Sequence, residues 1–145
     1  MKVQALGHVV IRVRDQERAE AFYNGILGIP IQVRMDSDKM TFFTLGDHHD
    51  FAIAVVGDEA SSAAPGAPGL DHLAFKVGDR IEDLRDAKAH LAAHGIAAAA
   101  VDHHVTLSLY CHDPDGNVVE LYIDASDSWK TDPNAVVAVS KVLEL

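Results

Sequence analysis

The chain is poor in several features that mark common protein classes. A single cysteine, Cys111, among 145 residues excludes an internal disulfide. Lysine and arginine together number 12 against 22 aspartates and glutamates, so the net charge of −10 offers no basic surface to nucleic acid or to an anionic membrane. No apolar run approaches the roughly 20 residues that a membrane span needs. We therefore expect no nucleic-acid partner and no membrane partner.

The N-terminal stretch also lacks the basic, apolar and small-residue order of a signal peptide. Together with the single cysteine, this absence predicts a reducing, cytoplasmic setting. A chain of this length suits one compact domain, which buries about 70% of the surface that its unfolded form exposes. We expect residues 1–145 to form a single domain.

Histidine, by contrast, is abundant, and many of the nine histidines lie at or near strand-like segments. The segment GHVVIRVRD at 7–15 aligns without gaps on DHLAFKVGD at 71–79, at an offset of 64 residues that pairs His8 with His72. Apolar and polar residues alternate in both segments, which predicts two strands. The repeat therefore indicates two related modules in one chain.

Helix signals and strand-like runs follow both repeat segments. Asp15 can cap the first helix, which Gly28 ends, and a second helix extends from near Ile81 to Gly95. Strand-like runs then follow at 29–35, 40–45 and 50–56 in the first half and at 96–102, 105–111 and 117–123 in the second. Each half thus predicts a βαβββ module of the α+β class.

The module boundaries follow from composition. We expect module 1 at about 1–57, a linker rich in Ala, Ser, Pro and Gly at 58–69, module 2 at about 70–125 and a C-terminal tail at 126–145. Because neither module closes a core by itself, we expect the two to pair around a shared metal-containing cavity. The pairing is open between one chain and two chains, and we expect a homodimer or a higher homo-oligomer.

Three side chains predict the metal site. His8 and His72 occupy the same position in the repeat, and Glu120 is a lone carboxylate in the apolar run NVVELYI. Such a carboxylate is costly to bury without a partner. Two imidazoles and one carboxylate form a facial triad for a divalent metal, with Fe(II) favoured and Mn(II) as the alternative. Any one of the three residues taken alone is better interpreted as a strand residue that is exposed to solvent or has its hydrogen bonds satisfied. Their repeat-related positions together favour the metal site.

The pattern GHVVIRVRD, AFYNGILG, DHLAFKV and DPDGNVVELY resembles the vicinal oxygen chelate superfamily, and the resemblance extends from Leu6 to Asp124. The resemblance implies paired βαβββ modules and a metal on His8, His72 and Glu120. The superfamily includes glyoxalases, epimerases, fosfomycin-modifying enzymes, ring-cleaving dioxygenases and metal-free antibiotic-binding proteins, so the fold alone does not choose the reaction.

The number of ligands favours one branch of that superfamily. A glyoxalase has a fourth protein ligand on the last strand of the first half, yet the offset of 64 maps Glu120 onto Val56, and the surrounding FAIAVV holds no ligand. A metal ion with three protein ligands keeps coordination positions free for a chelating diol and for dioxygen. The resemblance therefore implies an Fe(II)-dependent extradiol dioxygenase of the catechol 2,3-dioxygenase type, with an aromatic diol and O2 as substrates.

Two further motifs resemble extradiol dioxygenases. In HHDFAIAV the second histidine, His49, matches the acid/base that faces the substrate, whereas His48 should face the opposite way and be structural. In SLYCHDPDGNVVELY, Tyr110 matches the tyrosine that hydrogen-bonds a substrate oxygen, although an ordinary cross-strand aromatic is the alternative. Cys111, on the opposite strand face, reads as a core thiol.

One part of the dioxygenase pattern is incomplete. Dioxygenases commonly place a further His and an Asn upstream of that tyrosine, whereas this chain has VDHHVTLSLY with no Asn. His103 and His104 are the candidates, and we favour His104 as the substrate-binding residue because it is nearer the strand. A fosfomycin-type transferase or another metal-dependent isomerase, and a metal-free protein that binds an aromatic compound or antibiotic, are the alternatives on the same fold.

Overall fold

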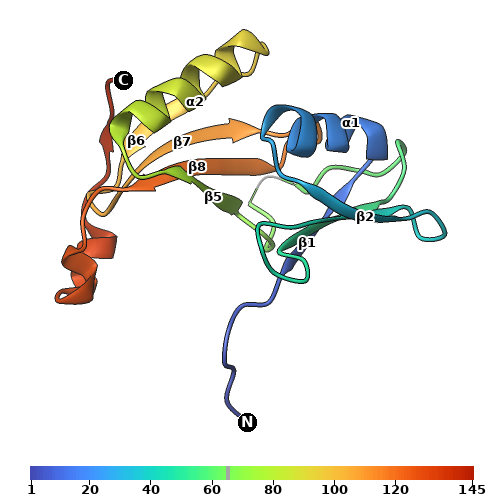
Figure 1. Cartoon of the computed structure of the whole chain (residues 1–145), viewed down its shortest axis with the longest axis horizontal. Coiled ribbons are helices and arrows are strands. Elements are labelled where there is room, and N and C mark those ends of the chain that lie inside the picture. The colour runs from blue at the N-terminus through green and yellow to red at the C-terminus, as the bar shows by residue number, and fades with distance from the viewer. Residues whose placement is uncertain (65) are drawn as a thin grey trace. The chain divides into compact units, whose positions relative to one another are not determined.

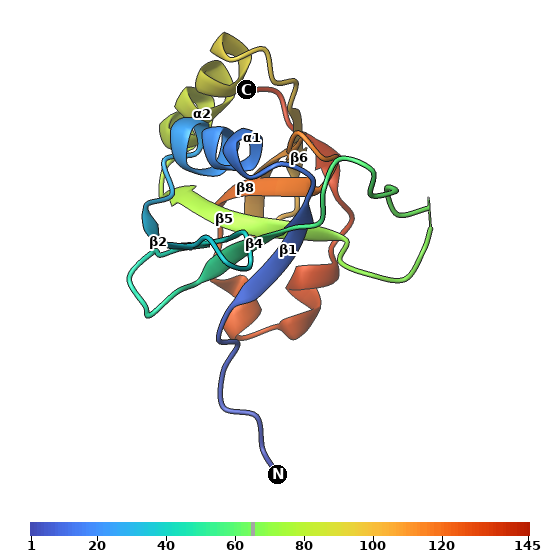
Figure 2. The ribbon, with the colours of Figure 1, turned by 90° about the vertical axis from the view of Figure 1, so that its right-hand side faces the viewer.

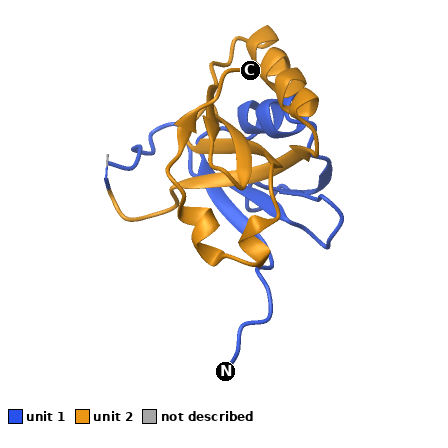
Figure 3. Cartoon of the chain, turned by 90° about the vertical axis from the view of Figure 1, so that its left-hand side faces the viewer, with its two compact units in different colours: residues 1–66 blue, residues 67–145 orange. Residues whose placement is uncertain are grey.

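The computed structural model describes residues 1–64 and 66–145, and its backbone divides into two compact units, Met1–Gly66 and Ala67–Leu145 (Figure 3). The division falls inside the predicted linker 58–69, of which Pro65 lies outside the described residues. We describe each unit by itself. None of the helices among the described residues is long and apolar enough to span a membrane.

Unit 1 is a four-stranded sheet with one helical segment. Its elements are β1 (Val9–Val13), α1 (Gln16–Glu20), the π-helical turn η1 (Ala21–Ile26), β2 (Ile31–Met35), β3 (Met40–Phe43) and β4 (Phe51–Val55). The strand order is β1-β4-β3-β2, and β1 runs parallel to β4. Figure 2 shows β1 and β4 next to each other. As predicted, the side chain of Asp15 accepts a hydrogen bond from the Arg18 amide and begins the helix.

Aromatic side chains form the core of unit 1. The Tyr23 ring from η1 lies 4.7 Å from the Phe51 ring of β4, and Phe51 lies 5.3 Å from Phe43 of β3, centroid to centroid. All three side chains are at most 2% exposed. Burial of large aromatic groups provides much of the hydrophobic stabilisation of a small unit. This packing holds the end of β3 and the start of β4 in place.

Unit 2 is a five-stranded sheet with a longer helix. Its elements are β5 (His72–Gly78), α2 (Ile81–Ala93), β6 (Ala99–Asp102), β7 (Thr106–His112), β8 (Val118–Asp124), the 3-10 turns η2 (Ser128–Lys130) and η3 (Pro133–Val137), and β9 (Lys141–Val142). The strand order is β5-β8-β7-β6-β9. The helix α2 lies along one face of this sheet (Figure 1), where Leu84 and Leu91 are buried. Both units thus have the predicted βαβββ order, and the α+β class is confirmed.

The strand registers show which positions of the two units are equivalent. In unit 2, Glu120 of β8 pairs with Ala74 of β5 and with Tyr110 of β7. Val10 stands at the repeat position of Ala74, and its strand partner is Ala52, which pairs with Phe42. We call Ala74, Glu120 and Tyr110 the polar row, and Val10, Ala52 and Phe42 the apolar row.

This register corrects the equivalence of Glu120 with Val56 that the fixed offset predicted. Phe51 pairs with Val9, 42 positions earlier, whereas Val118 pairs with His72, 46 positions earlier. The second unit therefore has four more residues between its paired parallel strands, and an offset taken from the first strands no longer holds at the last. Ala52 is the equivalent residue, and like Val56 it offers no metal ligand.

Candidate metal centre

Glu120 and His72 form the centre of the candidate site in unit 2. Glu120 is 7% exposed, and one of its oxygens, Oε2, lies 3.0 Å from Nε2 of His72. The other oxygen, Oε1, accepts a hydrogen bond of 2.5 Å from the hydroxyl of Ser108, a residue with no exposed surface. The lone carboxylate that the sequence singled out is thus buried and has a partner for each oxygen.

The imidazole of His72 is oriented from its other nitrogen. Nδ1 lies 2.7 Å from Oδ2 of Asp71, whose side chain is exposed. A carboxylate on the second ring nitrogen fixes the tautomer and ring orientation of a metal-binding histidine. Asp71 therefore leaves Nε2 of His72 directed at Glu120.

The donor set fits a divalent transition metal. Two adjacent ligands of an octahedral ion, each at about 2.1 Å, stand about 3.0 Å apart. The separation of 3.0 Å between His72 Nε2 and Glu120 Oε2 matches that spacing. One imidazole nitrogen and one carboxylate oxygen are the donors that Fe(II), Mn(II) and Zn(II) accept. The geometry of this pair is thus compatible with two adjacent ligands of one metal ion.

Tyr110 lies beside this pair. Its ring meets that of His72 edge to face at 5.7 Å, and its hydroxyl hydrogen-bonds the Glu120 carboxylate. Burial, together with the charge of Glu120, raises the pKa of the Tyr110 phenol to about 12. The phenol is therefore protonated at neutral pH and can act as a hydrogen-bond donor.

Unit 1 gathers His8, His48 and His49. Each offers one ligand atom, and these atoms all lie within 4.8 Å of one another. The rings of His8 and His49 are 4.1 Å apart, and those of His48 and His49 are 4.6 Å apart. Desolvation, followed by the neighbouring charges of His8 and His48, lowers the pKa of His49. His49 is therefore neutral at neutral pH and able to accept a proton.

The orientation predicted for His48 is wrong. The alternation argument placed His48 opposite His49, but residues 44–50 form a loop between β3 and β4 instead of a strand. Side chains alternate only where the backbone is extended. The His48 ring accordingly lies on the same side as its neighbour, 6.2 Å from His8, and its Nδ1 lies 3.1 Å from Oδ1 of Asp47.

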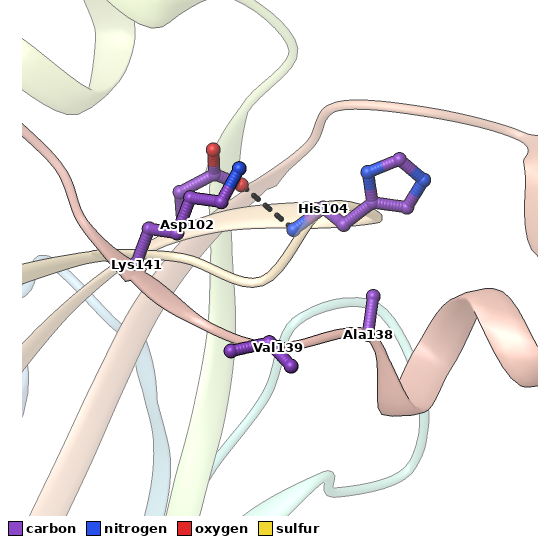
Figure 4. A pocket seen from close by; sticks show the side chains of 5 residues that line it. All are labelled: Asp102, His104, Ala138, Val139 and Lys141. Atoms are coloured by element: carbon purple, nitrogen blue, oxygen red, sulfur yellow. Dashed lines mark hydrogen bonds between the residues drawn. The ribbon is translucent and has the colours of Figure 1, made fainter.

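The structure separates the two candidate histidines upstream of Tyr110. His103 places Nε2 2.9 Å from the Tyr110 hydroxyl oxygen. His104 has a positive φ of 70° in the turn after β6, and its backbone amide donates to Asp102. Its exposed side chain lines a surface pocket that also includes Ala138 (Figure 4). His103, and not the favoured His104, therefore contacts Tyr110, because the hairpin backbone reverses direction at His104.

Two residues of the unit 2 site escaped the sequence interpretation. Ser108 is a lone polar residue in the apolar strand run VTLSLYC, two positions from Tyr110 and thus on the same strand face. That combination is the signal that could have identified it. Asp71 directly precedes His72, a pattern too common to be informative alone. Cys111 is fully buried, as expected of a core thiol, and burial raises its pKa to about 11.

Comparison with known proteins agrees with this architecture. Residues 5–121 match the Glyoxalase/Bleomycin resistance protein/Dioxygenase superfamily. The chain belongs to this superfamily. A solved structure of a glyoxylase/bleomycin resistance protein/dioxygenase domain from Frankia sp. EAN1pec has the same fold, with a TM-score of 0.71 at 23% identity over 85% of this chain and 99% of that one.

Curated relatives of this superfamily member differ in activity. Catechol-2,3-dioxygenase of Bacillus subtilis is 35% identical over 88% of this chain, but the match spans only 44% of that protein. Glutathione transferase FosA of Serratia marcescens is 26% identical over 83% of this chain and 82% of its own length. The chain thus spans about half the length of the dioxygenase and most of the length of the transferase.

Proposed function

We propose that this protein is an Fe(II)-dependent extradiol dioxygenase that cleaves a catechol-type aromatic diol and incorporates both atoms of O2. The observation that carries the proposal is the His72–Glu120 pair, with its two donor atoms 3.0 Å apart. His8 is the proposed third ligand. The 35% identity to a catechol-2,3-dioxygenase supports the choice of reaction.

The reaction divides into the chemistry that a bound metal would supply and the contributions of the surrounding side chains. A divalent iron held by His8, His72 and Glu120 supplies Lewis acidity that lowers the pKa of a coordinated phenol and the redox capacity to use dioxygen. Ser108 and Asp71 hold Glu120 and His72 in the orientation this requires. The overall conversion needs no external reductant, because one ring carbon–carbon bond beside the diol breaks and both oxygen atoms enter the product.

His49 is the proposed acid/base. Its lowered pKa leaves the ring neutral at neutral pH, so a ring nitrogen can accept the proton of a substrate hydroxyl. The resulting imidazolium can return that proton later in the reaction. We assign His48 no chemical step, although it lies beside His49.

Tyr110 is the proposed donor to a substrate oxygen. Because its pKa of about 12 keeps the phenol protonated, Tyr110 can donate its O–H wherever an oxygen replaces the Glu120 carboxylate as acceptor. The contact with His103 supports the phenol oxygen at the same time. We propose His103 in place of His104 for the upstream histidine of the site.

A second candidate function is a fosfomycin-type transferase on the same three ligands. It is favoured by the match to FosA, which extends over 82% of that protein's length. A transferase reaction would consume no oxygen, and it would assign no chemical role to His49 or Tyr110. The two functions therefore differ in one measurable co-substrate.

Oxygen consumption tests the proposal. The protein is loaded anaerobically with Fe(II), exposed to air, and supplied with a panel of monocyclic and bicyclic catechols while oxygen uptake and yellow ring-cleavage product are followed. We expect one oxygen molecule per product, with His49→Ala as the control in which uptake is strongly reduced. No uptake across the panel, with the iron content verified, would exclude the dioxygenase and favour the transferase.

A further inference from the structure

The C-terminal tail is joined to the unit 2 sheet next to Tyr110. Strand β9 pairs antiparallel with β6, so that Asp102 lies opposite Lys141 and Val101 opposite Val142. His103 and Ser140 are the next residues beyond the Asp102–Lys141 pair of this register. The backbone of the tail thus brings Ser140 to His103.

The side chains complete a hydrogen-bonded series. The Ser140 hydroxyl oxygen lies 2.7 Å from Nδ1 of His103. On the opposite side of the ring, His103 Nε2 lies 2.9 Å from the hydroxyl oxygen of Tyr110. The Tyr110 hydroxyl in turn hydrogen-bonds the Glu120 carboxylate. The series connects an exposed tail serine to the buried centre of the site.

For a neutral His103 ring and an ionised Glu120, donor and acceptor capacity gives one consistent set of bond directions in this series. An ionised carboxylate only accepts, so the single hydroxyl hydrogen of Tyr110 goes to Glu120. The Tyr110 oxygen must then accept from His103, which places the ring hydrogen on Nε2. Nδ1 of His103 is left as an acceptor, and the hydroxyl of Ser140 is its donor.

The tail has its own anchor, independent of this series. Asp132 caps the 3-10 turn η3 by accepting a hydrogen bond from the Asn134 amide, and Ala135 in that turn is buried. After the turn, the Leu143 amide donates to the carbonyl of Ala100 at 3.1 Å. The position of Ser140 is thus set by backbone contacts on both sides of it.

We propose that Ser140 is a positioning residue, which holds His103 as the Nε2-protonated tautomer and so directs the Tyr110 hydroxyl hydrogen into the site. The proposal rests on the proposed function for its catalytic meaning, while the tautomer itself does not depend on any reaction. Without the serine hydroxyl, Nδ1 of His103 loses its donor. The Nε2-protonated tautomer then loses part of its advantage over the form in which Tyr110 donates to Nε2. In this proposal the C-terminal tail contributes to the site by orienting His103.

The test is the tautomer of His103 in the full-length, metal-free protein. Nitrogen-15 NMR distinguishes the two imidazole tautomers, and the signal of His103 is identified by its loss in His103→Gln. We expect an Nε2–H ring in the wild type, a mixture or the Nδ1–H form in Ser140→Ala, and recovery of Nε2–H in Ser140→Thr. Val139→Ala, a change at the exposed neighbouring residue, is the matched control and should behave as wild type.

Each outcome decides the proposal. An unchanged Nε2–H signal in Ser140→Ala would overturn it, because water would then serve as well as the serine. Equal changes in Ser140→Ala and Val139→Ala, or no recovery in Ser140→Thr, would also overturn it, since only tail packing would be at work. Turnover is measured separately: a lost hydrogen bond predicts about a fivefold to tenfold lower kcat in Ser140→Ala with KM unchanged. Absence of any catechol cleavage would contradict the proposed function and leave the tautomer result standing.

Discussion

The polar row and the apolar row occupy equivalent positions of one repeated module and have opposite chemistry. In unit 2 the row contains Glu120 and Tyr110, whereas unit 1 has Ala52 and Phe42 at these positions. Ala52 has no exposed surface, so a carboxylate placed there would be buried without a partner such as Ser108. The buried acid Glu120 therefore occurs in the module whose neighbouring strand β7 supplies a hydrogen-bond donor, Ser108.

The histidines of the two units are held in different ways. His72 has a carboxylate on each ring nitrogen, at 2.7 Å and 3.0 Å. His8 and His49 meet mainly through ring contacts in and beside a loop. Because rigid ligands bind a metal with less loss of entropy, we expect unit 2 to provide the preorganised ligands and unit 1 to contribute the more adaptable groups.

The largest effect is expected from loss of the carboxylate in the polar row. Glu120→Ala removes one ligand and leaves Ser108 without its acceptor, so metal affinity should fall by more than about 100-fold and oxygen uptake should cease. Metal content after dialysis measures this. Asp124→Asn, near the end of the same strand, is the control and should retain the metal. A metal-replete Glu120→Ala protein would contradict the assignment.

The next largest effect should come from the unit 1 histidines. His49→Ala removes the proposed acid/base and should lower kcat by about 100-fold to 10,000-fold, with the metal content unchanged. His48→Ala is the matched control in the same loop, with a small effect expected. Parallel loss of metal and of turnover in His49→Ala would refute the acid/base role.

Ser108→Ala tests how much the buried hydrogen bond contributes to the polar row. Outer hydrogen bonds of this kind typically alter metal affinity by about 10-fold to 100-fold, and a value in that range is expected from a metal titration. Ser126→Ala, in the tail beyond β8, should leave the affinity unchanged. The same affinity in Ser108→Ala and wild type would mean that Glu120 is positioned by the strand alone.

Tyr110→Phe converts the polar row toward the apolar row. Loss of one hydrogen bond to substrate predicts about a tenfold fall in kcat, with metal binding retained. In the wild type, ultraviolet titration should include a tyrosine ionisation near pH 12 that is missing in the variant. Full activity of Tyr110→Phe would support the plain cross-strand aromatic instead.

The smallest effect concerns Cys111, next to Tyr110 on β7. Burial raises the thiol pKa from 9.0 to about 11, so the unfolded chain loses this proton at lower pH than the folded chain. The stability that this difference contributes is fully present below pH 9 and is lost as the pH rises through 11. At pH 9.5 the loss amounts to less than about 1 kcal/mol, and it should be absent from denaturation curves of Cys111→Ala. Equal pH dependence in both proteins would contradict the raised pKa.

The sequence predicted those parts of the molecule in which side chains alternate regularly. The repeat of His8 and His72 and the lone Glu120 identified two strands and a buried acid, because apolar alternation makes an out-of-place polar residue visible. The loop at His48 follows no such period. Its conformation depends on contacts with the β3 and β4 ends that one sequence does not display.

Register and tail pairing could not be predicted for a related reason. The four extra residues between β5 and β8 move Glu120 onto Ala52, and only the paired backbone shows this. The contact of Ser140 with His103 depends on the short strand β9, whose two residues carry no pattern of their own. Contacts between elements far apart in the chain decided both cases.

Metal binding by single-ligand variants tests the central proposal most directly, namely that His8, His72 and Glu120 are ligands of one metal ion. Anaerobic Fe(II) titration of the wild type, His8→Ala and His72→Ala gives the stoichiometry and affinity of each protein. The account predicts one tightly bound ion per wild-type chain and its loss in both variants. Undiminished binding in His8→Ala, together with loss in His72→Ala, would show that unit 2 holds the metal without unit 1 and would contradict the claim.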